Sequence, residues 1–370
     1  MKKTAIHLCH DYKMPFFDVA QQYCDVLKNE GYKVITVFLR GDKDESIERK
    51  SISDETLFYG LAAKEIKGLK IGLIFRIIKL CKQYEADLIV AHRSKAIYLS
   101  SMASFVLPHI KILGVTHRYG FFQRHNRKLL AYIRKKNLRL IGVSNAIRDD
   151  IRKFLPGFNE QHIQTLYNRL DFSNIVKALY SRKEARDKLG IPQGQYAFVN
   201  VGRLHPDKDQ RTLVAGFAEA LPEMENTHLY IAGKGRLEKR LKAQVNNLNL
   251  NKQITFLGVV PEIYRYLRAF NCFVLSSDHE PFGMVLLEAI AAGVPIITTD
   301  CGGAVEINIS KAKFSVGDIK MLAELLLEYR KMSATECSEL VNAQYSFAES
   351  RFSYDAARRF FSELLSSFIV

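Results

Sequence analysis

The sequence predicts an α/β fold with two domains, each built on a parallel sheet, and three observations support this. The chain has 370 residues, which exceeds the size that one hydrophobic core usually supports. Short β-branched runs alternate with longer amphipathic segments, which is the pattern of strands joined by crossover helices. The alternation occurs in two series, and we expect the break between them to lie between Leu170 and Ser181.

Each series contains five strand candidates, separated by segments of helical periodicity such as Val19–Asn29 and Ile71–Tyr84. The candidates of the first series are Ala5–Leu8, Lys33–Leu39, Asp87–Ala91, Ile112–Thr116 and Leu140–Val143. Those of the second are Ala197–Val201, His228–Ala232, Ile254–Leu257, Cys272–Leu275 and Pro295–Thr298. Strands that alternate with helices are joined by right-handed crossovers, so both sheets are expected to be parallel.

Composition excludes several classes of protein. A chain with 48% hydrophobic and 25% charged residues is ordinary for a globular protein and argues against disorder. The six cysteines are scattered without a Cys-x-x-Cys pair, which is typical of a reduced, cytoplasmic chain without structural zinc. His7, His10 and Asp11 interrupt the first apolar run, which therefore predicts a strand rather than a signal peptide. The uncharged stretch Ala96–Ile110 is too short to cross a bilayer.

The net charge of +15 is concentrated in the first half of the chain. Residues 1–170 hold 30 Lys and Arg against 16 Asp and Glu, whereas residues 171–370 hold 24 against 23. Between Asp87 and Asp149 there are 12 basic residues and no acidic one. Such a face attracts polyanions, and nucleic acid, an anionic membrane and an anionic acceptor substrate all remain possible partners.

Polar residues and glycines collect where the predicted strands end, which is the edge at which open α/β sheets bind ligands. In the first series they are His10 and Asp11, His92 and Arg93, His117 and Arg118, and Ser144. In the second they are Gly202 and Arg203, Gly233 to Gly235, Gly258, Ser276 to Glu280, and Asp300 to Gly303. We therefore expect a ligand cleft there.

The segment SSDHEPFGMVLLEAIAAGVPIITTDCGG, residues 276–303, is the most informative part of the chain. Gly283 can open a helix whose first N–H groups form an anion site. Glu280 lies just before that helix, and Glu288 lies within its apolar run. A helix that is apolar all round is buried, so the Glu288 carboxylate needs a partner, and ligand hydroxyls would supply one. A core helix with one internally bonded glutamate is the alternative.

The segment VGRLHPDKD, residues 201–209, leaves a predicted strand at Gly202 and places two cations on the following loop. The Arg203 guanidinium suits phosphate oxygens bidentately, and the Lys208 ammonium adds a point charge. Next to the start of the predicted helix at Gly283 they would stabilise charge on a departing diphosphate. The alternative is a solvated loop with incidental basic residues.

Two Asp-x-Asp patterns and a glycine-rich turn are weaker signals. Asp42 and Asp44 lie in what we expect to be a polar surface loop, and Asp209 looks like a helix N-cap rather than a metal ligand. No metal site is therefore predicted. Gly233 and Gly235 would let backbone approach a nucleotide base, although the third glycine of a dinucleotide fingerprint is missing.

The run EPFGMVLLEAIAAGVPIITTDCGGAVE resembles the Glu-x7-Glu signature of retaining glycosyltransferase family 4, which has the GT-B fold of two Rossmann-like domains. VGRLHPDKD resembles the Gly-Arg-Leu…Lys element of the same family. VSNAIRDDI, YNRLDFS and the final FSYDAARRFFSELL are also similar to it. The resemblance implies an acceptor-binding domain at 1–170, a donor-binding domain at 171–350, and a last helix at 351–370 that crosses back onto the first domain.

The resemblance assigns roles to individual residues. Arg203 and Lys208 would hold the donor diphosphate, Glu280 the hydroxyls of the donor sugar, and Glu288 those of the ribose. The remaining donor contacts would come from Gly202, Gly233, Gly283, Met284 and Val285. His117 would lie near the sugar, or would be a loop or core histidine without a binding role, and His92 is as readily structural. The catalytic set implied is Glu280, His117, Arg203 and Lys208.

The implied activity is a metal-independent, retaining hexosyl transfer from a nucleoside diphosphate sugar, with UDP expected ahead of GDP and without a cofactor. The acceptor would be a glycan or lipid-linked glycan of lipopolysaccharide core, O-antigen or exopolysaccharide synthesis. One departure from the family is that residues 10–18, after the first strand, contain no glycine, so the acceptor mode does not carry over.

The stretch Lys111–Arg139 mixes nine basic residues with aromatic and aliphatic ones, which suits an anionic leaflet. We therefore expect a cytoplasmic protein that attaches peripherally to the inner face of the cytoplasmic membrane, although a solvated helix face gives the same pattern. A nucleotide-sugar epimerase or phosphorylase on the same fold and a basic RNA-binding protein are the rival functions. The chain shows no recognisable nucleic-acid module, and its intact acidic and basic set argues against a lectin-like pseudoenzyme.

Overall fold

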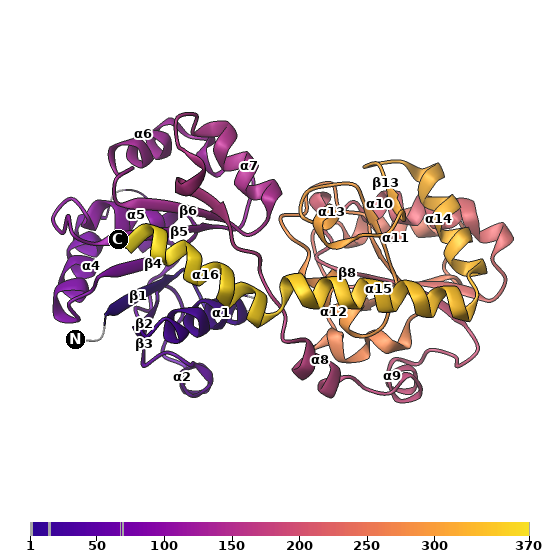
Figure 1. The fold of residues 1–370 in the computed structure, drawn as a ribbon. Coiled ribbons are helices and arrows are strands. Elements are labelled where there is room, and N and C mark those ends of the chain that lie inside the picture. Colours follow the sequence, from indigo (N-terminus) through magenta and orange to yellow (C-terminus); the bar gives the residue numbers. More distant parts are fainter. Residues whose placement is uncertain (1–2, 14–15, 67, 69, 370) are drawn as a thin grey trace. The chain divides into compact units, whose positions relative to one another are not determined.

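The computed structural model describes residues 3–13, 16–66, 68 and 70–369. The chain divides into two compact units (Figure 1). Unit 1 comprises Met1–Asn168 together with Tyr354–Val370, and unit 2 comprises Arg169–Ser353. The division thus falls two residues before the boundary expected after residue 170, and three residues after the one expected at 350.

Unit 1 contains a seven-stranded sheet with the strand order β3-β2-β1-β4-β5-β6-β7. Every neighbouring pair is parallel, as the alternation of strands and helices predicted. The strands are β1 (Thr4–Cys9), β2 (Lys33–Phe38), β3 (Glu55–Phe58), β4 (Leu88–His92), β5 (Lys111–Thr116), β6 (Leu138–Gly142) and β7 (Ile163–Thr165). All residues of the adjacent strands β1 and β4 are buried, because helices cover both faces of a parallel sheet.

The helices of unit 1 follow the strands and pack on each other as well as on the sheet. They are α1 (Phe16–Asn29), α2 (Glu45–Lys50), α3 (Ala63–Ile66), α4 (Ile71–Gln83), α5 (Arg93–Ala103), α6 (His125–Ile133), α7 (Asn145–Phe154) and α16 (Tyr354–Ile369). Helix α5 contacts both α4 and α6, whereas α16 packs on α1. The Arg358 guanidinium of α16 donates to both carboxylate oxygens of Asp25 in α1, at 2.7 and 3.1 Å.

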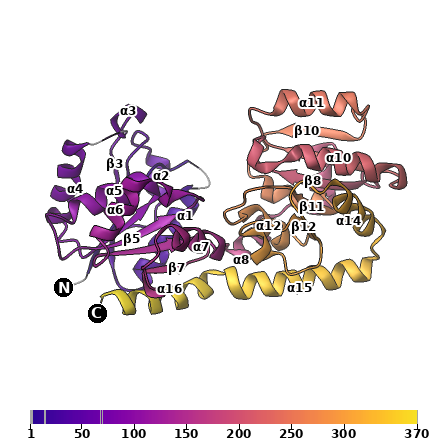
Figure 2. The same cartoon turned by 90° about the horizontal axis from the view of Figure 1, so that it is seen from above.

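Unit 2 contains a six-stranded parallel sheet with the order β10-β9-β8-β11-β12-β13. Its strands are β8 (Tyr196–Val201), β9 (Thr227–Ala232), β10 (Ile254–Gly258), β11 (Cys272–Leu275), β12 (Ile296–Thr299) and β13 (Lys313–Phe314). Figure 2 shows β10 towards one side of this unit and α15 (Ala334–Phe352) along the opposite side. Phenylalanine and leucine side chains that are fully buried, such as Phe198, Phe217 and Leu322, form its core.

The remaining helices of unit 2 bring the loops at the sheet edge into place. They are α8 (Phe172–Ala178), α9 (Arg182–Leu189), α10 (Gln210–Ala220), α11 (Glu238–Asn247), α12 (Met284–Ala291), α13 (Ala304–Ile307) and α14 (Ile319–Lys331). Helix α12 contacts α8, α15 and the 3₁₀ helix Ile263–Ala269. Asp209 caps α10 by accepting a hydrogen bond from the Thr212 N–H, as the sequence predicted.

All ten predicted strands are present, with ends that differ by at most two residues. The sequence analysis missed β3, β7 and β13, which are short and lie at or next to sheet edges. It was also wrong about the polar segment that contains Asp44, which forms the short helix α2 rather than a loop. The Asp44 carboxylate accepts from the N–H groups of Ser46 and Ile47 and so caps this helix. Across the described residues, no helix combines the length and apolarity that a membrane span needs.

Candidate functional site

The predicted donor residues lie in unit 2, in the loops at the carboxyl edge of its sheet. Gly202, Arg203 and Lys208 follow β8, Gly233 follows β9, and Glu280 follows β11. Since parallel strands end at the same edge, the fold brings loops together that are up to about 80 residues apart in sequence. Backbone hydrogen bonds join them, because the N–H of Asp278 donates to the carbonyl of Asp207 at 3.2 Å.

Lys208 and Glu280 form a direct ion pair at this edge. The Lys208 ammonium donates to Glu280 Oε2 at 2.6 Å, and the Ser277 hydroxyl donates to the same oxygen at 3.2 Å. The side chains are 20% and 8% exposed, so the pair is largely shielded from solvent. The Ser276 hydroxyl donates to the carbonyl of Lys208 at 2.9 Å and ties the two loops together. The sequence placed these residues in one site but did not predict that they touch.

Helix α12 begins directly behind this ion pair. Gly283 is its N-cap, with φ of 106°, a conformation that favours glycine. A Cβ at Gly283 would lie 3.5 Å from Glu280 Cγ, so the helix start and the carboxylate are neighbours. The N–H groups of Met284 and Val285 belong to the first turn and have no carbonyl of a preceding turn to bond. The predicted helix start at Gly283 is confirmed.

The accessible face of α12 carries three of the predicted donor residues. Met284, Val285 and Glu288 are half-buried, whereas Leu286 and Leu287 are fully buried. The expectation that this helix is buried on all sides is therefore wrong, because one strip of it stays open. Positions 284, 285 and 288 share that strip owing to the spacing of the helix.

Glu288 lies near the 3₁₀ helix Ile263–Ala269. The pKa of Tyr264 in that helix is raised, first by burial, then by Glu262, and to a smaller extent by Glu288. The Glu288 carboxylate is thus positioned on the open strip of α12, next to the loop that follows β10. The role expected of this carboxylate, to bond ligand hydroxyls, stays a prediction.

The double glycine after β12 closes the other side of the site. The Gly303 N–H donates to the carbonyl of Glu280 at 2.8 Å. A Cβ at Gly303 would lie 2.6 Å from the Cα atom of Phe282 and 2.7 Å from the carbonyl oxygen of Pro281. Only glycine allows this approach, so the two ends of the segment 280–303 are locked together by backbone.

A cavity of about 240 Å³ lies beside Gly202, Arg203 and Gly233. Gly233 has φ of 136°, and a Cβ there would lie 1.9 Å from the carbonyl oxygen of Gly202, so this floor can be made only by glycine. The opposite wall comes from Val259, Val260 and Ile263 after β10, which the sequence analysis missed. The apolar pair of valines directly after a predicted strand was the signal that could have revealed them.

Arg203 lines the same cavity and is the most open residue of the set. Its side chain is 72% exposed, and Nη2 lies 3.6 Å from Asp207 Oδ2. Gln210 holds its backbone, because Gln210 Nε2 donates to the Arg203 carbonyl at 3.1 Å. The guanidinium is therefore anchored at its base and retains freedom to meet a ligand.

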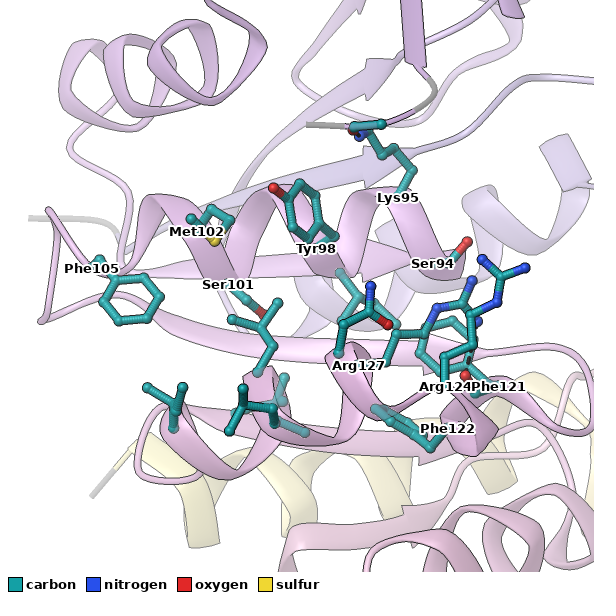
Figure 3. Close-up of a pocket in the computed structure, with 18 of the residues that line it drawn as sticks. Ser94, Lys95, Tyr98, Ser101, Met102, Phe105, Phe121, Phe122, Arg124 and Arg127 are labelled. Atoms are coloured by element: carbon teal, nitrogen blue, oxygen red, sulfur yellow. Dashed lines mark hydrogen bonds between the residues drawn. The ribbon is translucent and has the colours of Figure 1, made fainter. Parts of the chain in front are cut away.

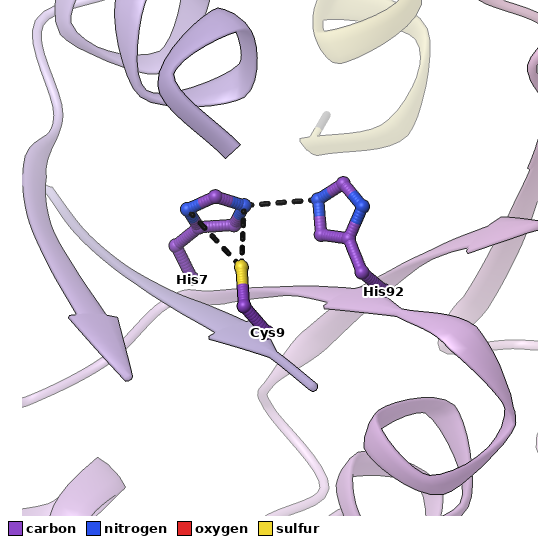
Figure 4. Close-up of side chains that lie close together, drawn as sticks. All are labelled: His7, Cys9 and His92. Atoms are coloured by element: carbon purple, nitrogen blue, oxygen red, sulfur yellow. Dashed lines mark hydrogen bonds between the residues drawn. The ribbon is translucent and has the colours of Figure 1, made fainter. Parts of the chain in front are cut away.

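His117 belongs to unit 1, at the end of β5, where it forms part of a chain of three histidines. His117 Nε2 lies 3.0 Å from His92 Nδ1, and His92 Nε2 lies 2.9 Å from His7 Nε2. Figure 4 shows His7 and His92 side by side, with Cys9 next to His7. This series of side-chain contacts continues from His7 to Cys24, because His7 Nδ1 lies 3.3 Å from Cys24 Sγ.

Burial keeps these histidines neutral. It lowers the pKa of His7 to about 3, and it lowers the pKa of His117 to about 3 with a further contribution from Arg93. The pKa of His92 falls well below its usual value, first through burial and then through His7 and His117. Because Nε2 of His117 is engaged by His92, its Nδ1 is the atom left for other partners. His92 thus contacts the buried His7 on one side and fixes the orientation of the His117 ring on the other.

His7, Cys9 and His92 also form a group that could supply three metal ligands, with their ligand atoms within 4.8 Å of one another. All three are buried, and the histidine nitrogens are already paired within the chain described above.

His10 and Asp11, at the start of the glycine-free segment after β1, lie near His117. His10, Asp11, Arg93 and His117 surround a small cavity, and Arg93 Nη1 lies 3.6 Å from Asp11 Oδ2. The Arg93 guanidinium also stacks on the Phe16 ring at 3.4 Å. Side chains rather than glycine backbone therefore shape this part of unit 1.

Two family models match the chain. Residues 19–173 match Glycosyltransferase Family 4, and residues 181–345 match Glycosyl transferases group 1. Together these segments cover most of both units. The chain belongs to the group 1 glycosyltransferases. The family predicted from the Glu-x7-Glu segment is thereby confirmed.

Solved structures show that this glycosyltransferase has the GT-B fold. A glycosyltransferase from Rickettsia africae superimposes with a TM-score of 0.85 over 100% of this chain and 99% of the other, at 16% identity. Anabaena HepE in complex with UDP and glucose superimposes with a TM-score of 0.80 over 99% and 100%, at 19% identity. Two Rossmann-like domains with parallel sheets were the predicted architecture.

Curated relatives of this glycosyltransferase are distant. An uncharacterized glycosyltransferase of Methanocaldococcus jannaschii is 24% identical over 61% of this chain and 59% of its own length. A lipopolysaccharide core biosynthesis glycosyltransferase of Rhizobium meliloti is 26% identical over 69% and 67%. The UDP-Gal:alpha-D-GlcNAc-diphosphoundecaprenol alpha-1,3-galactosyltransferase of Escherichia coli is 26% identical over 82% of each chain. The match thus spans little more than half of the archaeal relative.

Proposed function

We propose that this glycosyltransferase moves a hexosyl unit, with retention of configuration, from a nucleoside diphosphate sugar to a glycan or lipid-linked glycan. UDP is the first choice of nucleotide and GDP the second. The observation that carries the proposal is the shielded contact of Lys208 with Glu280 beside the first turn of α12. It combines a cation, a carboxylate and backbone N–H groups, which match the phosphates and hydroxyls of such a donor.

The donor would lie along the carboxyl edge of the unit 2 sheet. Its base fits the cavity between Gly233 and the valines Val259 and Val260, where backbone approaches closely. Its ribose hydroxyls would bond Glu288 on the open strip of α12. The diphosphate would then meet the N–H groups at the start of α12, and the sugar would reach Glu280. HepE of Anabaena, which shares the fold, has been crystallised with UDP and glucose.

The reaction breaks the bond between the sugar C1 and the donor phosphate oxygen and forms a bond between C1 and the acceptor oxygen. Negative charge develops on the departing diphosphate, where Arg203, Lys208 and the helix start would stabilise it. These groups would take the place of a metal ion. The acceptor oxygen would attack C1 from the face that the diphosphate leaves, so the configuration at C1 is retained, and its proton would pass to the leaving phosphate oxygen. Glu280 orients the sugar through its hydroxyls.

His117 would contribute from unit 1 as a neutral hydrogen-bonding group. Its imidazole is uncharged at neutral pH because its pKa is lowered to about 3, mainly by burial. With Nε2 held by His92, Nδ1 is the atom that would meet a hydroxyl of the donor sugar. A neutral ring can serve there as donor or acceptor without placing a charge next to C1.

The acceptor is proposed to be lipid-linked and the enzyme peripheral on the inner face of the cytoplasmic membrane. Support comes from the basic stretch Lys111–Arg139 and from relatives named for lipopolysaccharide core synthesis and for a diphosphoundecaprenol-linked acceptor. A basic surface with exposed apolar side chains is attracted to an anionic leaflet. The pathway would be bacterial lipopolysaccharide core, O-antigen or exopolysaccharide synthesis.

A donor screen tests the proposal. Purified enzyme is incubated with UDP-, GDP-, ADP- and CMP-sugars, and release of the nucleotide is measured with and without EDTA. We expect UDP release that EDTA does not lower, and at least tenfold slower release by Glu280→Gln. Loss of activity with EDTA would contradict metal independence, and conversion of the free donor to an epimer would contradict transfer.

Membrane attachment has its own test. Co-sedimentation with anionic and with neutral liposomes is compared at about 0.1 M salt, where the Debye length is about 10 Å. We expect binding to anionic liposomes only, and weaker binding by Lys135→Glu/Lys136→Glu. Indifference to anionic liposomes would contradict the peripheral location without affecting the donor screen.

A further inference from the structure

A cavity of unit 1 lies between α5 and α6 and plays no part in the donor site. Its volume is about 980 Å³, which is at the upper end of the range of about 300–1,000 Å³ typical of small-molecule sites. Figure 3 shows α5 above it and α6 below it. Its lining is mostly apolar, with Tyr98, Met102 and Leu130 as examples.

The cavity has two ends of different character. Figure 3 shows Ser94, Phe121 and Arg124 at one end and Met102 and Phe105 at the other. The first end therefore lies at the start of α5, and the second lies near the end of α5. A ligand that matches both ends has a polar, anionic head and an extended apolar tail.

The end of the cavity that holds Arg124 is next to the edge of the sheet where His117 lies. Helix α5 starts at Arg93, directly after β4, so its first turn marks the carboxyl edge. His10 lines this cavity and also the small cavity that it shares with Arg93 and His117. The head of a ligand held here would lie at this edge of the unit 1 sheet, near His117, and its tail would run away from it.

The cations at this end are not neutralised by carboxylates. Among the described residues, Arg118, Arg124 and Arg127 form no salt bridge. Arg127 Nη1 donates to the carbonyl of Phe121 at 2.8 Å, which holds the guanidinium in place. The pKa of Arg127 is lowered, first by burial and then by Arg124 and Arg118. Clustered guanidinium groups of this kind match the oxygens of a phosphate or diphosphate.

The apolar end opens among exposed apolar side chains. Phe105, Leu129 and Ile133 line the cavity and are 49%, 62% and 53% exposed. Val106, next to Phe105 in the sequence, is 55% exposed. Phe75 on α4, which packs beside α5, is 63% exposed. An apolar rim of this kind marks an interaction site, and a bilayer is the surface from which a hydrocarbon tail would enter.

We propose that this cavity is the lipid subsite of the acceptor, with a polyprenyl chain between α5 and α6 and its diphosphate at Arg124 and Arg127. This inference rests on the proposed function and names the acceptor as a polyprenyl diphosphate-linked glycan. Charge complementarity selects that occupant, because a neutral diacylglycerol offers nothing to the guanidinium groups. The glycan attached to the diphosphate would then extend to the sheet edge at His117.

A fluorescence titration tests the subsite directly. The chain contains no tryptophan, so Tyr98→Trp places a single indole in the cavity wall. Farnesyl diphosphate and geranylgeranyl diphosphate are added in the presence of saturating UDP, which keeps diphosphates out of the donor site. We expect a saturable blue shift with both, and tighter binding of the longer chain. Tyr345→Trp, a half-buried position in unit 2, is the control and should show no shift.

The comparison ligands separate head from tail. Inorganic pyrophosphate should give no blue shift, and farnesol should bind at least about tenfold more weakly than farnesyl diphosphate, since charged hydrogen bonds are lost. An equal response to pyrophosphate, an equal affinity for farnesol, or no response to either diphosphate would overturn the proposal. If Tyr98→Trp does not fold, equilibrium dialysis of labelled geranylgeranyl diphosphate with the unsubstituted enzyme measures the same binding.

Two variants with the same change in net charge show whether binding depends on the two cavity arginines or only on the positive charge of the protein as a whole. Arg124→Glu/Arg127→Glu is expected to weaken binding of geranylgeranyl diphosphate at least about tenfold. Lys128→Glu/Lys136→Glu, on residues outside the cavity lining, should change it less than about twofold because solvent screens those charges. Equal losses in both variants would overturn the assignment.

Failure of this inference and failure of the proposed function give different results. Unsubstituted enzyme that releases UDP from a donor but does not bind isoprenoid diphosphates would remove the lipid subsite alone. Enzyme that binds them but turns over no nucleotide sugar would remove the proposed function and leave the subsite as a lipid site of another kind.

Discussion

Lys208 Nζ and Glu280 Oε2 lie 2.6 Å apart, and 72 residues of the chain separate them. The contact joins the loop after β8 to the loop after β11, with Ser277 as a second partner of the carboxylate. A residue proposed to bind phosphate and one proposed to bind sugar thus hold each other in place. The same pair therefore links the stability of unit 2 to its chemistry.

Removing the ammonium while keeping the carboxylate is expected to destabilise unit 2. Lys208→Met leaves the Glu280 side chain, 8% exposed, as a shielded charge without its cation, which typically costs about 3–5 kcal/mol. The double variant Lys208→Met/Glu280→Gln should recover part of this loss. Urea unfolding of the single and double variants measures the coupling. A coupling below about 0.5 kcal/mol would show that the two side chains act independently.

Glu288 on the open strip of α12 and the exposed Arg203 guanidinium are expected to matter for turnover rather than for folding. Glu288→Ala and Arg203→Ala should each lower kcat/KM for the donor at least tenfold, which corresponds to about 1.4 kcal/mol or more. Glu324→Ala and Arg211→Ala remove exposed residues of the same types elsewhere in unit 2 and serve as controls. Unchanged kinetics in both site variants would remove them from the donor site.

A methyl group at Gly233 is expected to disrupt the close backbone contact between the loops after β8 and β9. The new Cβ would meet the Gly202 carbonyl oxygen at 1.9 Å, and φ of 136° is unfavourable for alanine. Gly233→Ala should therefore lower the melting temperature and weaken the stabilisation by UDP. Gly194→Ala, where nothing lies within 4 Å of a Cβ, should leave both unchanged. Differential scanning fluorimetry with and without UDP distinguishes the two, and equal behaviour would contradict the geometry.

The chain of three histidines should make the protein sensitive to acid. In the folded state the pKa values of His7 and His117 are about 3, against 6.5 for the free side chain. Between those values the unfolded chain binds more protons than the folded one, so stability falls as the pH drops from 6.5 towards 3. Each histidine contributes up to about 1.4 kcal/mol per pH unit.

Replacing one of the three histidines should weaken this dependence of stability on pH. His92→Gln removes a titrating group whose folded pKa lies well below its usual value, so the slope of unfolding free energy against pH should decrease. His109→Gln, at an exposed position, should leave the slope unchanged. The slopes are read from urea unfolding between pH 4 and pH 6.5, and identical slopes for both variants would contradict burial of neutral imidazoles.

Much of the fold could be predicted because its strands are buried on both faces and are therefore continuous apolar runs. The missed strands lack that signal. Glu55–Phe58 is a short edge strand with an exposed first residue, and Lys313–Phe314 has only two residues in the sheet. The helix Glu45–Lys50 buries none of its residues, so only its Asp44 cap could have indicated it.

Most residues of the candidate donor site could be proposed from the sequence because they belong to two continuous segments, 201–209 and 276–303, with typical spacing. Their roles stay predictions. The histidine chain could not be predicted, since His7 and His92 are 85 residues apart and their contact depends on β1 lying beside β4. The cavity between α5 and α6 could not be predicted either, for a similar reason. Most of its lining comes from two helices and the turn Phe121–Gln123, and neither helix alone contains a recognisable pattern.

The division of the chain has a consequence for its synthesis. Unit 1 is formed by residues 1–168 together with the last helix α16, whose Phe361, Leu364 and Leu365 are buried. A nascent chain leaving the ribosome must therefore make all of unit 2 before unit 1 can close. Until then the surface of α1 that α16 covers stays open to water, and such apolar surface attracts chaperones or promotes aggregation. Premature termination near residue 353 would release a protein with this surface permanently bare.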